Sequence, residues 1–80
     1  MKLILTPEAV EWFFSREYIP FRDVEKAKLI CELRLNGETL QSIGKRVGLS
    51  VDRVRQYIYK VQHTYDRAVN VAAKWKHIIN

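Results

Sequence analysis

The amino-acid sequence predicts an all-α domain of about four helices, of which the last is long. Apolar residues recur at helical spacing in separate segments, and capping residues, prolines or glycines mark where those segments begin and end. No proline or glycine occurs from residue 51 to residue 79, so one helix can span that whole stretch. At 80 residues, the chain is expected to form a single domain with a modest core.

The first helix is expected to begin close to the N-terminus. Thr6, Pro7 and Glu8 supply a capping oxygen, a proline at the first helical position and an acid near the positive end of the helix dipole. The helix is expected to run to about residues 16–18, before the break at Pro20. Its bulky apolar side consists of Val10, Phe13 and Phe14.

A second helix is expected from about Arg22 to Leu35, which completes an N-terminal part formed by residues 1–37. Asn36 and Gly37 follow as good helix terminators.

Aromatic side chains are concentrated between residues 12 and 21. We expect most of them to lie in the core, behind the helices that follow. Alternatively, part of the cluster is an exposed docking surface for a protein partner, because interfaces concentrate their binding energy in aromatic side chains. The cluster consists of Trp12, Phe13, Phe14, Tyr18 and Phe21.

Residues 39–62 have the spacing of two helices joined by a tight turn. Thr39 can cap the first of these helices and Ser50 the second. Gly48 suits the left-handed conformation that ends a helix. The apolar face of the first helix consists of Leu40, Ile43 and Val47. The pattern predicts a helix-turn-helix, and residues 63–80 extend its second helix.

The second helix of this motif is expected to have a buried and an exposed face. Its buried stripe consists of Val54, Ile58 and Val61. Leu49 is expected to tuck beneath the turn that Gly44 and Gly48 serve. At about 100° per residue, the side chains that point away from Val54 are Asp52, Gln56, Tyr59, Lys60 and His63, with Arg53 and Arg55 on opposite flanks.

This exposed face suits the major groove of DNA, where short polar groups read base edges and flanking cations reach phosphates. An amide pairs with adenine, a carboxylate accepts from cytosine, and a guanidinium pairs with guanine. An ordinary solvated helix face is the alternative. The predicted base-reading residues are Asp52, Arg53, Gln56 and Tyr59.

The run TLQSIGKRVGLSVDRVRQ (residues 39–56) resembles the C-terminal helix-turn-helix of primary bacterial sigma factors, known as region 4. The matching residues are Thr39, Leu40, Ile43, Gly44, Arg53, Val54, Arg55 and Gln56. The resemblance covers about residues 39–62 and implies that Thr39 meets a DNA phosphate, that Asp52 and Gln56 face bases, and that Arg53 and Arg55 lie near the DNA backbone or bases. It also makes RNA polymerase a candidate partner.

Two positions depart from the pattern of that family. Val51 stands where the family usually has an arginine, and Asp52 where it usually has a glutamate. Each departure predicts a loss of about 1–3 kcal/mol of discrimination for the family's usual promoter element. The predicted phosphate contacts of this chain are Thr39, Lys45, Arg46, Ser50, Arg55 and Lys60.

The positive charge is concentrated in the second half of the chain. Residues 1–44 hold six Lys or Arg and seven Asp or Glu, a net charge of −1. Residues 45–80 hold eight and two, a net charge of +6, which suits a polyanion. We therefore expect a small sequence-specific protein that binds double-stranded DNA, as a transcription regulator of a bacterium or phage. The alternatives are a protein-interaction module that binds RNA polymerase or another protein, and a DNA-binding subunit of a recombination or phage-packaging assembly.

The stripe on the last helix continues as heptads past the helix-turn-helix. Nearly 30 residues of helix would measure about 40 Å, longer than a domain of this size is wide. Either the N-terminal helices or a second chain must cover the far half. A two-fold dimer would place its reading helices about 34 Å apart, on a near-palindromic site. The residues expected at such a self-association surface are Tyr65, Ala68, Ala72, Trp75 and Ile79.

Catalytic, metal and cofactor functions find little support. His63 and His77 lie 14 residues apart without a cysteine or acidic cluster at metal spacing, and there is no phosphate-binding glycine loop. We expect no enzyme and no cofactor. No apolar run is long enough for a membrane span, and residues 1–5 are too short for a secretory signal. The single cysteine, Cys31, is expected to be a buried thiol in a cytoplasmic protein.

Overall fold

The structure is a computed structural model that describes the backbone of residues 5–79 and the side chains of residues 5–73. It contains the helices α1 (Pro7–Phe14), α2 (Val24–Leu35), α3 (Leu40–Val47) and α4 (Val51–Ile79), and no strand occurs in this part of the chain. The predicted all-α fold with four helices is confirmed.

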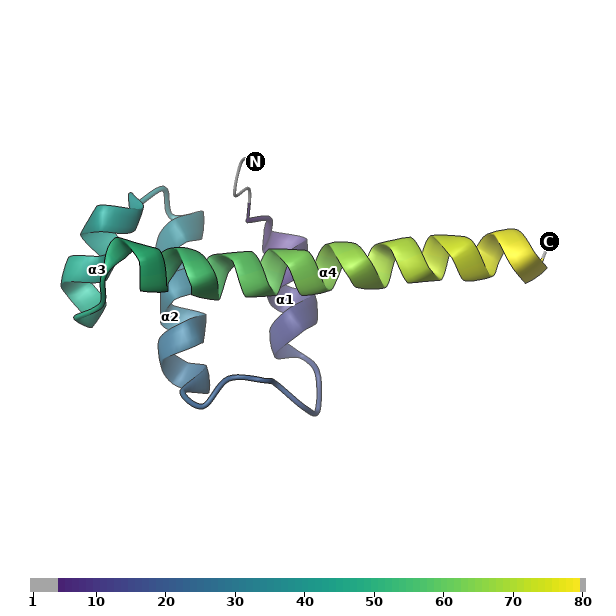
Figure 1. Cartoon of the computed structure of the whole chain (residues 1–80), viewed down its shortest axis with the longest axis horizontal. Coiled ribbons are helices and arrows are strands. Elements are labelled where there is room, and N and C mark those ends of the chain that lie inside the picture. The colour runs from purple at the N-terminus through teal and green to yellow at the C-terminus, as the bar shows by residue number, and fades with distance from the viewer. Residues whose placement is uncertain (1–4, 80) are drawn as a thin grey trace.

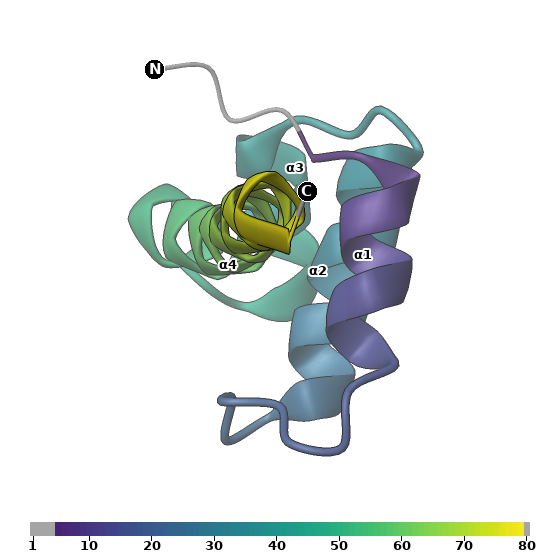
Figure 2. The same ribbon diagram turned by 90° about the vertical axis from the view of Figure 1, so that its right-hand side faces the viewer.

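The fold is elongated because α4 extends well past the other helices (Figure 1). Its extents are 49 × 27 × 19 Å. Looking along α4, Figure 2 shows α1 and α2 together on one side of it, and neither helix covers the opposite side. No helix in the described chain is both long and apolar enough to cross a lipid bilayer.

Both N-terminal helices are shorter than predicted. The first begins as expected, with Thr6 Oγ1 accepting from the Ala9 N–H at 3.2 Å. It ends at Phe14 rather than at residues 16–18, and the Ser15 hydroxyl donates to the Trp12 carbonyl at 2.9 Å. A serine that binds a carbonyl one turn back competes with helix propagation.

The second helix begins at Val24 rather than at Arg22. Asp23 precedes it as the N-cap, and its carboxylate accepts from the Lys26 N–H at 3.1 Å. Aspartate is among the best capping residues, so the helix starts directly after it. The end of this helix is as predicted, because Leu35 is its last residue and Gly37 takes a φ of 92°.

The core lies between α4 and the other three helices and consists of two clusters. One joins α1 and α2 to the middle of α4 through Val10, Phe13, Cys31 and Val61. The other joins α2 and α3 to the first turns of α4 through Ile30, Ile43, Val54 and Ile58. The predicted stripe of Val54, Ile58 and Val61 is confirmed, since all three are fully buried. Leu49 packs against the second cluster, as predicted.

Cys31 is buried in the first cluster, as the sequence predicts. Burial raises the pKa of its thiol to about 12, and the neighbouring Glu32 carboxylate adds to the rise. The thiol therefore stays protonated at neutral pH and acts as a small apolar side chain.

The aromatic segment divides between core and surface. Phe13 is fully buried, and Phe21 and Phe14 are half-buried around it. Tyr18 is 74% exposed, so the expectation that most of the cluster is buried does not extend to this residue. Trp12 is 36% exposed and contacts Tyr65 of α4 at 5.8 Å between ring centroids.

Candidate nucleic-acid interface

The turn between α3 and α4 is built as a helix-turn-helix requires. Gly48 ends α3 with a φ of 72°, in the left-handed region that favours glycine. The Leu49 N–H donates to the Gly44 carbonyl at 2.9 Å. Ser50 Oγ then accepts from the Arg53 N–H at 3.2 Å, as the predicted cap of α4. The turn is therefore held by a backbone hydrogen bond and by the side-chain cap of Ser50.

Gly44 serves the turn from inside α3, where it is buried, and not as a residue of the turn itself. A Cβ atom on Gly44 would lie 2.6 Å from the Leu49 carbonyl oxygen. Because Gly44 has no side chain, the backbone of the turn can pass close to α3. The chain reverses its direction at Gly48, which has the positive φ.

The predicted base-reading residues lie together on the exposed part of α4. Asp52, Arg53, Gln56 and Tyr59 are all exposed, and all fall within the first three turns of the helix. The helices α1 and α2 lie together on one side of α4 (Figure 2), and Arg53 and Gln56 line a hollow with the loop that joins them.

One of these residues is already paired within the chain. Asp52 accepts from Arg55 Nη1 at 3.1 Å, and both side chains are more than half exposed. An exposed pair of this kind contributes about 0–1 kcal/mol and separates easily. The pair still lowers the net positive charge on that flank of α4.

Tyr59 and His63 stack on each other at the exposed face, one helical turn apart. Their ring centroids are 5.4 Å apart and their planes are nearly parallel, at 7°. The stack gives this part of α4 a flat aromatic surface next to Gln56.

The predicted phosphate residues of α3 lie beside the first turns of α4. Thr39 Oγ1 accepts from the Ser42 N–H at 3.1 Å and caps α3. Thr39 and Lys45 line a shallow hollow of about 360 Å³. Arg46 lines the same hollow, but its guanidinium pairs with the Glu38 carboxylate at 2.8 Å. Among residues 5–73, Lys45 has no carboxylate within ion-pair distance, so it is the better placed of these two cations for an anion.

Lys60 is engaged by the loop between α1 and α2. Its Nζ donates to the Pro20 carbonyl at 2.8 Å and lies 5.0 Å from the centroid of the Phe21 ring. The residues around it enclose a hollow of about 260 Å³ that also includes Arg22 and Arg53. Reasoning from sequence missed Arg22, because it lies 31 positions before Arg53 and carries no motif signal.

The predicted self-association residues are partly covered by α1 and partly exposed. Tyr65 and Ala68 are half-buried, and Tyr65 packs on Trp12 of α1. An N-terminal helix therefore covers this part of the stripe, which was one of the two alternatives. Ala72 is exposed, and so are its neighbours Val69 and Val71, which are 49% and 48% exposed. The side chains of Trp75 and Ile79 lie outside the described residues.

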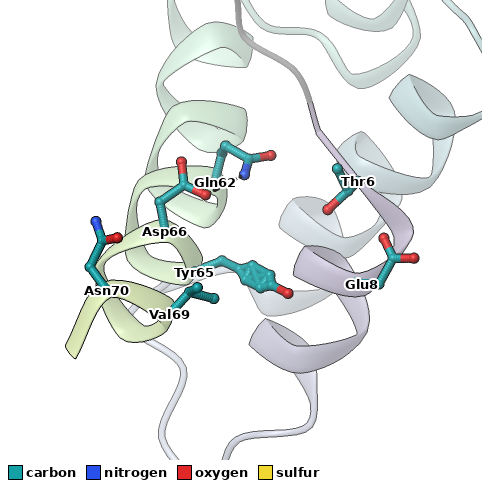
Figure 3. A pocket seen from close by; sticks show the side chains of 7 residues that line it. All are labelled: Thr6, Glu8, Gln62, Tyr65, Asp66, Val69 and Asn70. Carbon is teal, nitrogen blue, oxygen red and sulfur yellow. Dashed lines mark hydrogen bonds between the residues drawn. The ribbon is translucent and has the colours of Figure 1, made fainter. Parts of the chain in front are cut away.

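A further hollow of about 510 Å³ lies between the start of α1 and the middle of α4 (Figure 3). The carboxylates of Glu8 and Asp66 line it, which disfavours a polyanion there. Within the described residues, no three His, Cys, Asp or Glu side chains are placed to hold a metal ion.

The chain matched no protein-family model, no curated protein and no solved structure in the comparisons made. The resemblance of residues 39–62 to sigma region 4 therefore stays a prediction from sequence.

Proposed function

We propose that this protein binds double-stranded DNA in a sequence-specific manner, with the first turns of α4 in the major groove. The observation that carries the proposal is the surface opposite the core, where Asp52, Gln56 and Tyr59 are exposed together on a helix that follows a tight glycine turn. Helices presented in this way place their N-terminal residues against base edges.

Cations on α3 and on α4 support the proposal. Lys45 lies on α3, before the turn, while Arg53 and Lys60 lie on the flank of α4 that faces the loop between α1 and α2. A groove in B-DNA is bordered by a phosphate backbone on each side, so a reading helix needs positive charge on both flanks. In this proposal the chain acts as a transcription regulator of a bacterium or phage.

The first experiment is selection of bound sequences from a random pool of double-stranded DNA. A recovered motif would support a sequence reader. Weak binding without enrichment, lost between 50 and 200 mM salt, would count against sequence reading. In that case a protein-interaction module, with RNA polymerase as the candidate partner, or a subunit of a larger DNA-processing assembly becomes the preferred function.

Replacing Gln56 by alanine should weaken binding to the selected site by about 1–3 kcal/mol, because the side-chain amide is expected to pair with one base. Binding to unrelated DNA should change little. Titration of both duplexes by fluorescence anisotropy measures the two losses. The matched control is Gln62→Ala in the same helix, since Gln62 is half-buried and bonds to Asp66 at 2.9 Å. Equal losses on both duplexes would remove Gln56 from the reading surface.

Self-association stays a prediction from the heptad pattern. If a second chain covers the far half of α4, the molar mass in solution should be twice that of the 9.5 kDa chain, and Ala72→Asp should return it to the monomer value. Ala72 is exposed, so the substitution should leave the monomer folded. Light scattering measures both masses, and a monomeric wild type would contradict the predicted dimer.

A further inference from the structure

We propose that Arg22, Arg53 and Lys60 form a clamp for a single DNA phosphate at the edge of the groove. The inference rests on the proposed DNA binding and deepens it. It assigns a function to the loop between α1 and α2, and it places Arg53 on the backbone of the DNA rather than on a base.

The three cations come from two separate parts of the chain. Arg53 and Lys60 are two turns apart on α4, seven positions from each other, and so share one flank of the helix. Arg22 comes from the loop that runs from the end of α1 to the start of α2 (Figure 1). All three line the same hollow of about 260 Å³.

No carboxylate of the described side chains neutralises this cluster. Within residues 5–73, neither Arg22, Arg53 nor Lys60 has an acidic side chain at ion-pair distance. The nearest acid along the chain to Arg22 is Asp23, which caps α2 and lies 4.0 Å from Lys26. Three like charges around one hollow repel each other, and an anion between them relieves the repulsion.

Lys60 is held in place before any ligand binds. The Pro20 carbonyl accepts one of its three N–H groups at 2.8 Å, so two donors are left for a phosphate. The loop itself is fixed to α4, because the Phe21 ring stacks on Tyr57 with centroids 5.1 Å apart. Arg22 and Arg53 add planar guanidinium groups, whose geometry matches two phosphate oxygens at once.

The position of the clamp favours the DNA backbone over a base. Successive residues of a helix are rotated by about 100°, and Val54 marks the buried direction of α4. Arg53 and Lys60 lie about 60–80° from the direction opposite Val54, at the side of the exposed surface. The hollow lies beside the loop between α1 and α2, and Gln56 lines it next to the three cations. A contact to the backbone at this point would fix the register of Gln56 in the groove.

The test is the salt dependence of binding for Arg22→Ala. Each phosphate contact adds about 0.9 to the slope of log Kobs against log salt concentration. Arg22→Ala should weaken binding to selected and unrelated duplexes by the same factor and should lower the slope by about 0.9 on both. Arg22→Lys keeps the charge and should keep the slope. The matched control is Lys28→Ala, which removes one exposed cation from α2 and should change neither quantity.

An unchanged slope for Arg22→Ala, with DNA binding intact in the wild type, would overturn the clamp and leave the proposed function standing. Absence of DNA binding by the wild type would overturn both. Arg53→Ala separates the two roles considered for that residue. A uniform loss on both duplexes supports the clamp, whereas a loss confined to the selected duplex would return Arg53 to base reading.

Discussion

Replacing Ile58 by alanine is expected to lower the free energy of unfolding by about 2–5 kcal/mol. Ile58 is fully buried in the cluster that joins α2 and α3 to α4. The smaller side chain would leave a cavity lined by Ile30, Ile43 and Val54. These residues belong to three different helices, which limits how far they can move to fill it. A loss of this size is a large part of the 5–15 kcal/mol that stabilises a typical domain.

Urea unfolding followed by helical circular dichroism measures this loss as a lower midpoint with an unchanged slope. Leu29→Ala serves as the control, because Leu29 is 45% exposed on α2 and its truncation should cost far less. If Ile58→Ala cost no more than Leu29→Ala, α4 would not be packed on α2 and α3 in the way described.

Replacing Gly44 by alanine is expected to destabilise the helix-turn-helix by about 1–3 kcal/mol. The added Cβ atom would lie 2.6 Å from the Leu49 carbonyl oxygen, which belongs to the backbone and has little room to move. Helix propensity alone predicts the opposite sign, a gain of about 1 kcal/mol, because alanine replaces glycine inside a helix. The sign of the change therefore separates the two effects.

The same urea titration gives the sign of the change in the free energy of unfolding. Gln41→Ala is the matched control. Gln41 is exposed on the same helix, so alanine there should be neutral or slightly stabilising. Stabilisation by Gly44→Ala would mean that the turn does not pass as close to α3 as the structure places it. If the turn is pushed away, we also expect weaker DNA binding, since Ser50 and Arg53 follow directly after it.

The sequence by itself determined the order of the four helices and the turn, because these depend on neighbours a few residues apart, although it placed the end of α1 and the start of α2 wrongly. Thr39, Gly48 and Ser50 act through bonds within one turn of helix, and the structure places them as the sequence predicts. The buried stripe of α4 was equally readable, since one apolar face at helical spacing has to meet the core.

The tertiary structure decided which parts of the chain meet. Nothing near Gly44 in the sequence shows that the Leu49 carbonyl lies against it, and the spacing from Arg22 to Arg53 hides their shared hollow. The hollow shared by Arg22 and Arg53 depends on how α1 and α2 pack across α4. Periodicity indicates only which face of a helix is buried and not which element covers it. For the same reason, the sequence predicted the exposed face of α4, whereas the hydrogen bond from Lys60 to the Pro20 carbonyl became visible only in the fold.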